Sequence, residues 1–367
     1  MRQAIGIKSD KERFEPALAH SIDGLQYLRA VAALMVVFHH ARWLFPADCI
    51  LNTAAWSEFG SRGVDIFFVI SGFVMAYSTR SFDPAGSRPA QAADFLVKRL
   101  IRVVPLYWVA TLWTARRIIW HGNVDLDLVK DFLFLPRFHE HDHGMVWPIV
   151  FQGWTINYEM FFYALFALAM LAGRLRFLAL SLALLALTLL GVLASFTHAN
   201  TNSAAIIFYT SNLLVEFLMG VWLCLWMRGH SYRPSRVVLG GIAAIGFALI
   251  SLPNSDLVRG FADGIAATMI VWSTVLWSDG VELPRVRRLG DASYSIYLFH
   301  MTFFGASKWL LGSIDLLQPT AVNMVIVIPL YLVAASALGI LAHRTVERPM
   351  LSFFGSLRSR RIRSVTA

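Results

Sequence analysis

An arginine and a histidine interrupt the first apolar run of the chain, LRAVAALMVVFHH at 28–40. Arg29 and His40 are 11 positions apart, which in an α-helix is three turns plus about 20° and about 16 Å of rise. We therefore expect both on one face of one helix, and we expect His39 to point elsewhere. A histidine with an ordinary pKa of about 6.5 is suited to take a proton from a hydroxyl, and an arginine could stabilise an anionic donor.

Other apolar runs also carry ionisable residues: Glu159 in GWTINYEMFFYALF, His300 in DASYSIYLFH, Glu216, and Asp65 in SRGVDIFFVISGF. A charged side chain at the centre of a membrane span costs about 2.5–3.5 kcal/mol on insertion scales unless it is paired or hydrated. Taken alone, Arg29 could extend to the headgroups and His40 could make an interhelical hydrogen bond. The set together favours a polar interior site, in which a carboxylate such as Glu159 or Asp65 could hold the histidine ring in one tautomer.

The composition indicates a membrane protein, because 57% of the 367 residues are hydrophobic, only 15% are charged, and the mean hydropathy is +0.58. A short run at 131–136 is too brief to cross a bilayer. We predict an all-α polytopic membrane protein, one integral domain with about ten transmembrane helices. The expected spans are 24–44, 63–79, 101–119, 148–172, 177–196, 205–227, 237–252, 261–278, 292–311 and 322–343.

Basic residues are concentrated on one side of these spans. If the N-terminus is cytoplasmic, the outer segments hold only Arg42, Arg62, Arg116, Arg117, Lys130, Arg137 and Arg259. This bias predicts cytoplasmic N- and C-termini, and it explains the net charge of +9 without nucleic-acid binding. We expect a cytoplasmic segment at 1–21 with no cleaved signal peptide, a transmembrane domain at 22–350, and a basic cytoplasmic tail at 351–367 near anionic lipid headgroups.

Two features of the sequence predict no chemistry. Cys49 and Cys224 fall near opposite faces of the expected bundle, so we expect no disulfide between them. The stretch HEHDH at 139–143 places three histidines at alternate positions, close enough to bind a metal. Because a loop of this kind seldom supplies a defined ligand geometry, we interpret it as a solvated polar loop and expect no metal site.

The motifs resemble those of acyltransferase family 3, integral membrane enzymes that O-acylate extracytoplasmic glycans. The resemblance covers residues 22–350, and the opening GLQYLRAVAALMVVFHH looks closest to bacterial exopolysaccharide acyltransferases. In chain order, the matching elements are the arginine and histidine of the first span, SRGVDIFFVISGF (61–73), KRLIRVVPLYW (98–108), WTINYEMFFY (154–163), SYSIYLFH (293–300) and ERP (347–349).

The resemblance implies transfer of an acyl group, with acetyl expected, from cytoplasmic acyl-CoA to a sugar hydroxyl of a lipid-linked or periplasmic glycan such as an exopolysaccharide or O-antigen. It also implies the inner membrane, no permanently bound cofactor and no metal. The implied catalytic residues are His40, Arg29 and Glu159. Arg99 and Arg102 become donor-binding residues, although positive-inside anchoring also explains them. The implied substrate-binding residues are Asp65, Ser71, Trp154, Tyr297 and His300.

Several alternatives stay open at this stage. His40 could deprotonate the acceptor, or it could carry the acyl group as an acyl-histidine. A proton-coupled transporter or flippase of glycan precursors is the alternative function, with the same buried residues as a proton relay. Inverted repeats with helices broken by glycine or proline would favour a transporter, and we find none. A scaffold would leave the buried ionisable residues unexplained, and no oligomeric state is indicated.

Overall fold

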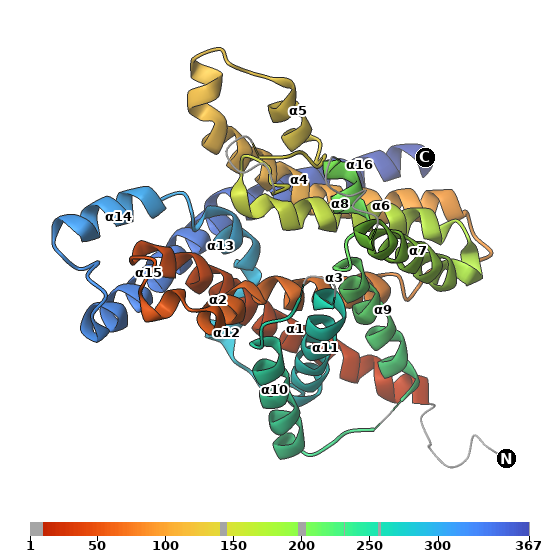
Figure 1. Ribbon diagram of the computed structural model, residues 1–367. Helices are drawn as coiled ribbons and strands as arrows, with labels where there is room; N and C mark the ends of the chain where they lie inside the picture. The colour runs from red at the N-terminus through yellow and green to blue at the C-terminus, as the bar shows by residue number, and fades with distance from the viewer. Residues whose placement is uncertain (1–9, 140–144, 197–202, 231, 256–257, 367) are drawn as a thin grey trace.

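The computed structural model describes residues 10–139, 145–196, 203–230, 232–255 and 258–366, and no β-strand occurs among them (Figure 1). The first helices are α1 (Asp10–Ala41), α2 (Ala54–Ser61), α3 (Gly63–Ser78), α4 (Arg88–Trp120), α5 (Leu126–Phe132), α6 (Trp154–Met170) and α7 (Arg176–Phe196). They are followed by α8 (Ala204–Tyr209), α9 (Leu214–Gly229), α10 (Arg236–Ile250), α11 (Arg259–Trp277), α12 (Pro284–Asp291), α13 (Ser293–Phe299), α14 (Phe304–Ser313), α15 (Ala321–Ala342) and α16 (Arg348–Thr366). The predicted all-α class is confirmed.

Helix occurs in all ten stretches that the sequence analysis marked as spans. By length and composition, five helical segments of the described residues could cross a membrane: Ala54–Ser78, Gly173–Phe196, Ala204–Gly229, Arg259–Trp277 and Ala321–Arg358. The apolar helix α10 is shorter, α6 has 17 residues, and α1 and α4 include polar first turns. A helical chain with several such segments is a multi-pass membrane protein.

Two expected spans are broken, and one begins late. The stretch 205–227 divides between α8 and α9, and 292–311 divides between α13 and α14 at residues 300–303. Neither break contains glycine or proline. The stretch 148–172 becomes α-helical only at Trp154, after a 3₁₀ turn at Phe151–Gly153. Glu159 therefore lies in the second turn of α6, not deep inside a long helix as expected.

Helices α1 and α3 form the centre of the molecule (Figure 1). Helix α1 packs against α3, α11, α12, α13 and α15, and α3 packs against α9 and α11. In Figure 1, α9, α10 and α11 lie on one side of this pair, and α4, α6 and α7 lie on the other. Residues far apart in sequence are therefore brought together around α1 and α3.

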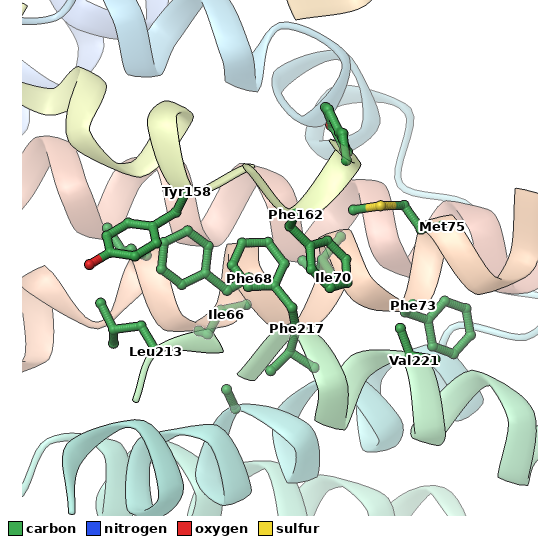
Figure 2. Close-up of a cluster of buried hydrophobic side chains, with 14 of the residues drawn as sticks. Ile66, Phe68, Ile70, Phe73, Met75, Tyr158, Phe162, Leu213, Phe217 and Val221 are labelled. Atoms are coloured by element: carbon green, nitrogen blue, oxygen red, sulfur yellow. The ribbon is translucent and has the colours of Figure 1, made fainter. Parts of the chain in front are cut away.

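Aromatic rings from three helices fill the space beside α3 (Figure 2). The ring of Phe217 stacks on Phe68 at a centroid distance of 4.5 Å and on Phe162 at 4.4 Å. All three side chains are buried. Stacked rings of this kind contribute about 0.5–1.5 kcal/mol per pair beyond the area that they bury, so this cluster fixes α3, α6 and α9 relative to one another.

Two glycines allow the backbones of α3 and α9 to touch. A Cβ atom at Gly72 would lie 1.9 Å from the carbonyl oxygen of Phe217, and one at Gly220 would lie 2.0 Å from that of Val69. Neither position can accept a side chain without moving the helices apart. Small residues at such contacts are common between membrane helices, where close packing supplies much of the association energy.

The C-terminal part of the chain is joined to α13 by one buried carboxylate, that of Glu347. A π-helical turn, His343–Glu347, joins α15 to α16. Its Glu347 accepts hydrogen bonds from Ser295 of α13 at 2.6 Å and from His343 at 2.9 Å. The ERP motif thus holds α13 in place. Cys49 and Cys224 are free, so no disulfide joins them, and both are buried.

Candidate active site

Two neighbouring cavities lie between α1, α3, α6 and α13. The first, of about 240 Å³, is lined by three arginines, Arg29 of α1 with Arg99 and Arg102 of α4, and by Glu159 of α6. We call it the arginine cavity. Most of its remaining lining is aliphatic or aromatic, so its few charged groups are concentrated on an otherwise apolar surface.

The second cavity, of about 460 Å³, lies at the C-terminal end of α1 and is lined by His39 and His40. We call it the histidine cavity. Arg259 of α11 is the arginine among its lining residues. Three indole rings also line it, from Trp43, Trp147 and Trp154. Flat aromatic faces beside a few polar groups suit a ligand that has both apolar and polar faces, as a sugar ring has.

The structure gathers most of the residues that the sequence singled out, but it divides them between the cavities. The arginine cavity holds Arg29, Ser71, Arg99, Arg102, Glu159 and Tyr297. The histidine cavity holds His40, Trp154 and, again, Tyr297. Asp65 and His300 line neither cavity. Arg29 and His40 therefore belong to separate cavities, consistent with their separation along α1.

A contact between two histidines sets the protonation pattern of His40. Its Nδ1 lies 3.0 Å from the carbonyl oxygen of Val36 and 2.9 Å from Nε2 of His300. Nδ1 of His300 lies 2.8 Å from the carbonyl oxygen of Tyr297. Because carbonyl oxygens only accept hydrogen bonds, we assign the proton of each neutral ring to Nδ1. Nε2 of His40 is then the unprotonated nitrogen, able to take a proton or attack a carbonyl carbon.

Neither Glu159 nor Asp65 is a partner of His40, and no other carboxylate of the described residues bonds to its ring. Glu159 accepts hydrogen bonds from Ser71 at 3.1 Å and from Tyr163, one turn along α6. Asp65 faces Arg259. The expectation was wrong because the spacing of residues within one helix carries no information about which side chain of another helix reaches the ring.

His39 does not point away from the site, contrary to the expectation from a helical wheel. It lines the histidine cavity, and its ring meets that of His40 edge to face at 5.0 Å. Its Nδ1 lies 3.1 Å from the carbonyl oxygen of Ser57, and Arg42 also reaches it. Near the end of α1, the chain folds back as α2 and closes over the face that His39 occupies, so both histidines end beside one cavity.

The arginines of the arginine cavity have few protein partners. Nη2 of Arg99 donates to Ser78 at 2.7 Å, and its guanidinium lies over the ring of Phe95. Across the described part of the chain, Arg29 and Arg102 have no carboxylate within ion-pair distance. Three guanidiniums around one carboxylate leave an excess of positive charge, which favours an anionic ligand.

Two polar atoms lining the arginine cavity were missed by the sequence analysis. Oε1 of Gln26 and Oγ of Ser293 are buried and have no hydrogen-bond partner among the described residues. Gln26 is one turn before Arg29 on α1, which is a signal that helical spacing could have supplied. Unpaired buried polar atoms are costly, so these two atoms are candidates to bind a polar ligand.

Asp65 belongs to a buried ion network next to the histidine cavity. Its carboxylate lies 3.7 Å from Arg259, and Asp263 lies 3.0 Å from Arg62 and 3.8 Å from Arg259. Glu216 of α9 is also fully buried, and neither of its carboxylate oxygens has a hydrogen-bond partner among the described residues. The network joins α3, α9 and α11 and holds Arg259 at the cavity wall. Asp65 is therefore placed to position Arg259, not to touch a ligand.

The histidine-rich stretch 139–143 is described only at its first residue, and 140–144 lie outside the described residues. His139 packs against Trp147 at a ring-centroid distance of 6.4 Å. Over the part of the chain that the structure describes, no three or more His, Cys, Asp or Glu side chains come together as metal ligands.

Comparisons with known proteins identify the family of the chain. A family model described as an acyltransferase domain matches residues 22–344. Exopolysaccharide production protein ExoZ of Rhizobium meliloti (strain 1021) is 32% identical over 327 residues, covering 84% of this chain and 93% of that protein. Nodulation protein 10 of Rhizobium leguminosarum bv. viciae is 25% identical, covering 75% of this chain and 80% of its own. Acyltransferase MdmB of Streptomyces mycarofaciens is 25% identical, covering 92% and 93%. No solved structure matches the chain.

Proposed function

Because the chain belongs to the acyltransferase domain family, we propose that this membrane O-acyltransferase moves an acetyl group from cytoplasmic acetyl-CoA to a sugar hydroxyl of an extracytoplasmic or lipid-linked glycan. The observation that carries the proposal is the pair of adjoining cavities, one rich in arginine and one lined by His40, whose Nε2 we assign as unprotonated. The name of the relative ExoZ supports an exopolysaccharide as the acceptor.

The arginine cavity is the proposed donor site. Arg99 and Arg102 bind the phosphates of the donor, and Arg29 adds a third positive charge. The unpaired atoms of Gln26 and Ser293 match the amide groups of the pantetheine arm. Arg99 also lines a third cavity, of about 380 Å³, which contains Lys98 and offers room for the nucleotide.

The histidine cavity is the proposed acceptor site. The indole faces of Trp43, Trp147 and Trp154 cover the apolar face of a sugar ring. His40 takes the proton of the acceptor hydroxyl at Nε2, and the oxygen attacks the thioester carbonyl. The C–S bond breaks, the C–O ester bond forms, and the proton passes to the departing CoA thiolate. His300 stabilises the imidazolium that forms on His40, since Nδ1 keeps its hydrogen bond.

The proposed topology follows the sequence analysis. Ten spans place both termini in the cytoplasm and the protein in the bacterial inner membrane. The segments 1–21, 22–350 and 351–367 are the cytoplasmic N-terminus, the transmembrane domain and the basic tail. The arginine cavity then faces the cytoplasmic supply of acyl-CoA, and the histidine cavity faces the outer side.

Substituting Arg102→Ala raises the KM for acetyl-CoA by about 10-fold or more, since a charge-assisted hydrogen bond contributes about 1.5–3 kcal/mol. Acetyl-pantetheine, which lacks the phosphates, should be used equally by the variant and the wild type. Arg116→Ala is the matched control, because Arg116 lies on α4 outside the cavities and contacts the backbone of Trp113. An unchanged KM for acetyl-CoA in Arg102→Ala would remove this residue from the donor site.

Substituting His300→Ala lowers acyl transfer by about 10- to 100-fold, because the hydrogen bond that stabilises the His40 imidazolium is worth about 1.5–3 kcal/mol. The loss is smaller than for His40→Ala, since Nδ1 keeps the carbonyl oxygen of Val36. A role through His40 predicts a shift in the pH dependence of kcat, which a purely structural role would not produce. The measurement is kcat against pH for both enzymes.

The function itself is tested with membranes containing the protein, radiolabelled acetyl-CoA and a crude glycan fraction. Label should enter the glycan as an alkali-labile ester. Label retained on denatured protein without acceptor would instead reveal an acyl-histidine. If no acyl donor and no glycan give label, the proposed function fails and a proton-coupled transporter takes its place.

A further inference from the structure

The arginine and histidine cavities share two lining residues, Val64 of α3 and Tyr297 of α13. Val64 is 6% exposed and Tyr297 is 5% exposed, so both are packed in the wall between the cavities. If the donor is bound in one cavity and His40 lies in the other, the acyl carbon has to reach His40 past these two side chains.

The side chain of Tyr297 is held in one position by hydrogen bonds. Its hydroxyl donates to the carbonyl oxygen of Gln152 at 2.9 Å and lies 2.7 Å from Oγ1 of Thr155. The amide of Gln152 in turn donates to the carbonyl oxygen of Leu298 at 2.6 Å. Moving the ring would break several buried hydrogen bonds, so Tyr297 keeps its position.

Val64 is the opposite side, and its backbone is held as well. A Cβ atom at the preceding Gly63 would lie 2.4 Å from the carbonyl oxygen of Ala32, so this end of α3 rests directly on α1. Val64 is β-branched, with a restricted χ1 in a helix. The width of the passage therefore depends on the size of the side chain at position 64.

We propose that Val64 and Tyr297 form the passage through which the acyl group meets the acceptor, and that the volume of Val64 limits the length of the acyl chain transferred. The inference rests on the proposed function and adds to it the residue that selects the donor. An acetyl group extends one methyl beyond the thioester carbonyl and passes beside Val64. Longer chains press their additional methylenes against its branched side chain, and an overfilled site is penalised.

The experiment compares transfer from equimolar acetyl-CoA and butyryl-CoA in competition, using the full-length protein in membranes. Val64→Ala should raise the butyryl-to-acetyl product ratio by about 10-fold, as one methylene group in a fitted site commonly changes selectivity by about 10- to 200-fold. Val64→Ile should lower that ratio below the wild-type value. Val69→Ala is the control, because Val69 is a buried valine of the same helix that lines neither cavity. Its product ratio should stay at the wild-type value.

Three results would overturn the inference. The first is a wild-type ratio in both Val64 variants while acetyl transfer continues. The second is an equal change in Val69→Ala, which would indicate general loosening of the packing around α3. The third is an increase in both Val64→Ala and Val64→Ile. Failure of the proposed function itself looks different, because the wild type would then transfer neither acyl group.

Discussion

Replacing His40 with alanine lowers acyl transfer by about 10²- to 10⁴-fold, the contribution of a well-placed general base. The reason is that Val36 and His300 hold Nδ1 of His40, so Nε2, which we assign as unprotonated, belongs to a ring that lines the histidine cavity, the proposed acceptor site. No other histidine is arranged in this way among the described residues. The measurement is initial-rate transfer of labelled acetyl at matched protein levels.

His39→Ala is the matched control for this variant, because His39 is the adjacent residue and lines the same cavity. Its Nδ1 lies at hydrogen-bonding distance from the carbonyl oxygen of Ser57, and no hydrogen bond joins it to another histidine among the described residues. The expected loss is less than about 10-fold, in line with one hydrogen bond of about 1 kcal/mol. Normal transfer by His40→Ala, or equal losses in the two variants, would contradict the assignment of His40 as the base.

Replacing Arg62 with alanine destabilises the protein by about 3–5 kcal/mol, the usual cost of removing one partner from a buried ion pair. Arg62 is 2% exposed and lies 3.0 Å from Asp263, which is fully buried, and it also pairs with Glu58. Without the guanidinium of Arg62, the carboxylate of Asp263 keeps Arg259 at 3.8 Å as a positively charged neighbour. The buried network then has too little positive charge to balance its carboxylates. The measurement is the midpoint of thermal unfolding in detergent.

A surface ion pair of the same chain supplies the control. Arg233 and Asp279 are 45% and 35% exposed, so Arg233→Ala should cost about 0–1 kcal/mol. The double variant Arg62→Ala with Asp263→Asn should recover part of the stability lost in Arg62→Ala, because no charge is then left uncompensated. A midpoint for Arg62→Ala as high as that of Arg233→Ala would show that the network contributes little.

The positions of the helices were largely predictable, because apolar runs of bilayer length have few alternative structures in a membrane. The breaks in α8–α9 and α13–α14 were not, since they contain neither glycine nor proline and depend on packing. The start of α6 at Trp154 was not predictable either, because the apolar run begins six residues earlier, at Pro148.

The candidate site was predictable as a set of residue types and not as a set of contacts. Charged side chains in apolar runs identified the charged residues of the arginine cavity, because burying a charge in a membrane span costs free energy unless the charge is paired or hydrated. The pairing of His40 with His300 joins residues 260 positions apart, which no periodicity reports. Val64 and Ser293 gave no signal because a valine or a serine is unremarkable in a membrane helix.

The buried ion network also joins parts of the chain that leave the ribosome at different times. Arg62 and Asp263 are about 200 residues apart, which is about 10–40 s of synthesis at about 5–20 residues per second. During this interval Glu58, one turn away, is the ion-pair partner of Arg62 that has already been made. When α11 has been made, it brings Asp263 to Arg62 and Arg259 to Asp65, which completes the buried ion network. Nascent chains arrested before α11 should therefore stay cross-linked to the insertion machinery, and chains arrested after it should be released.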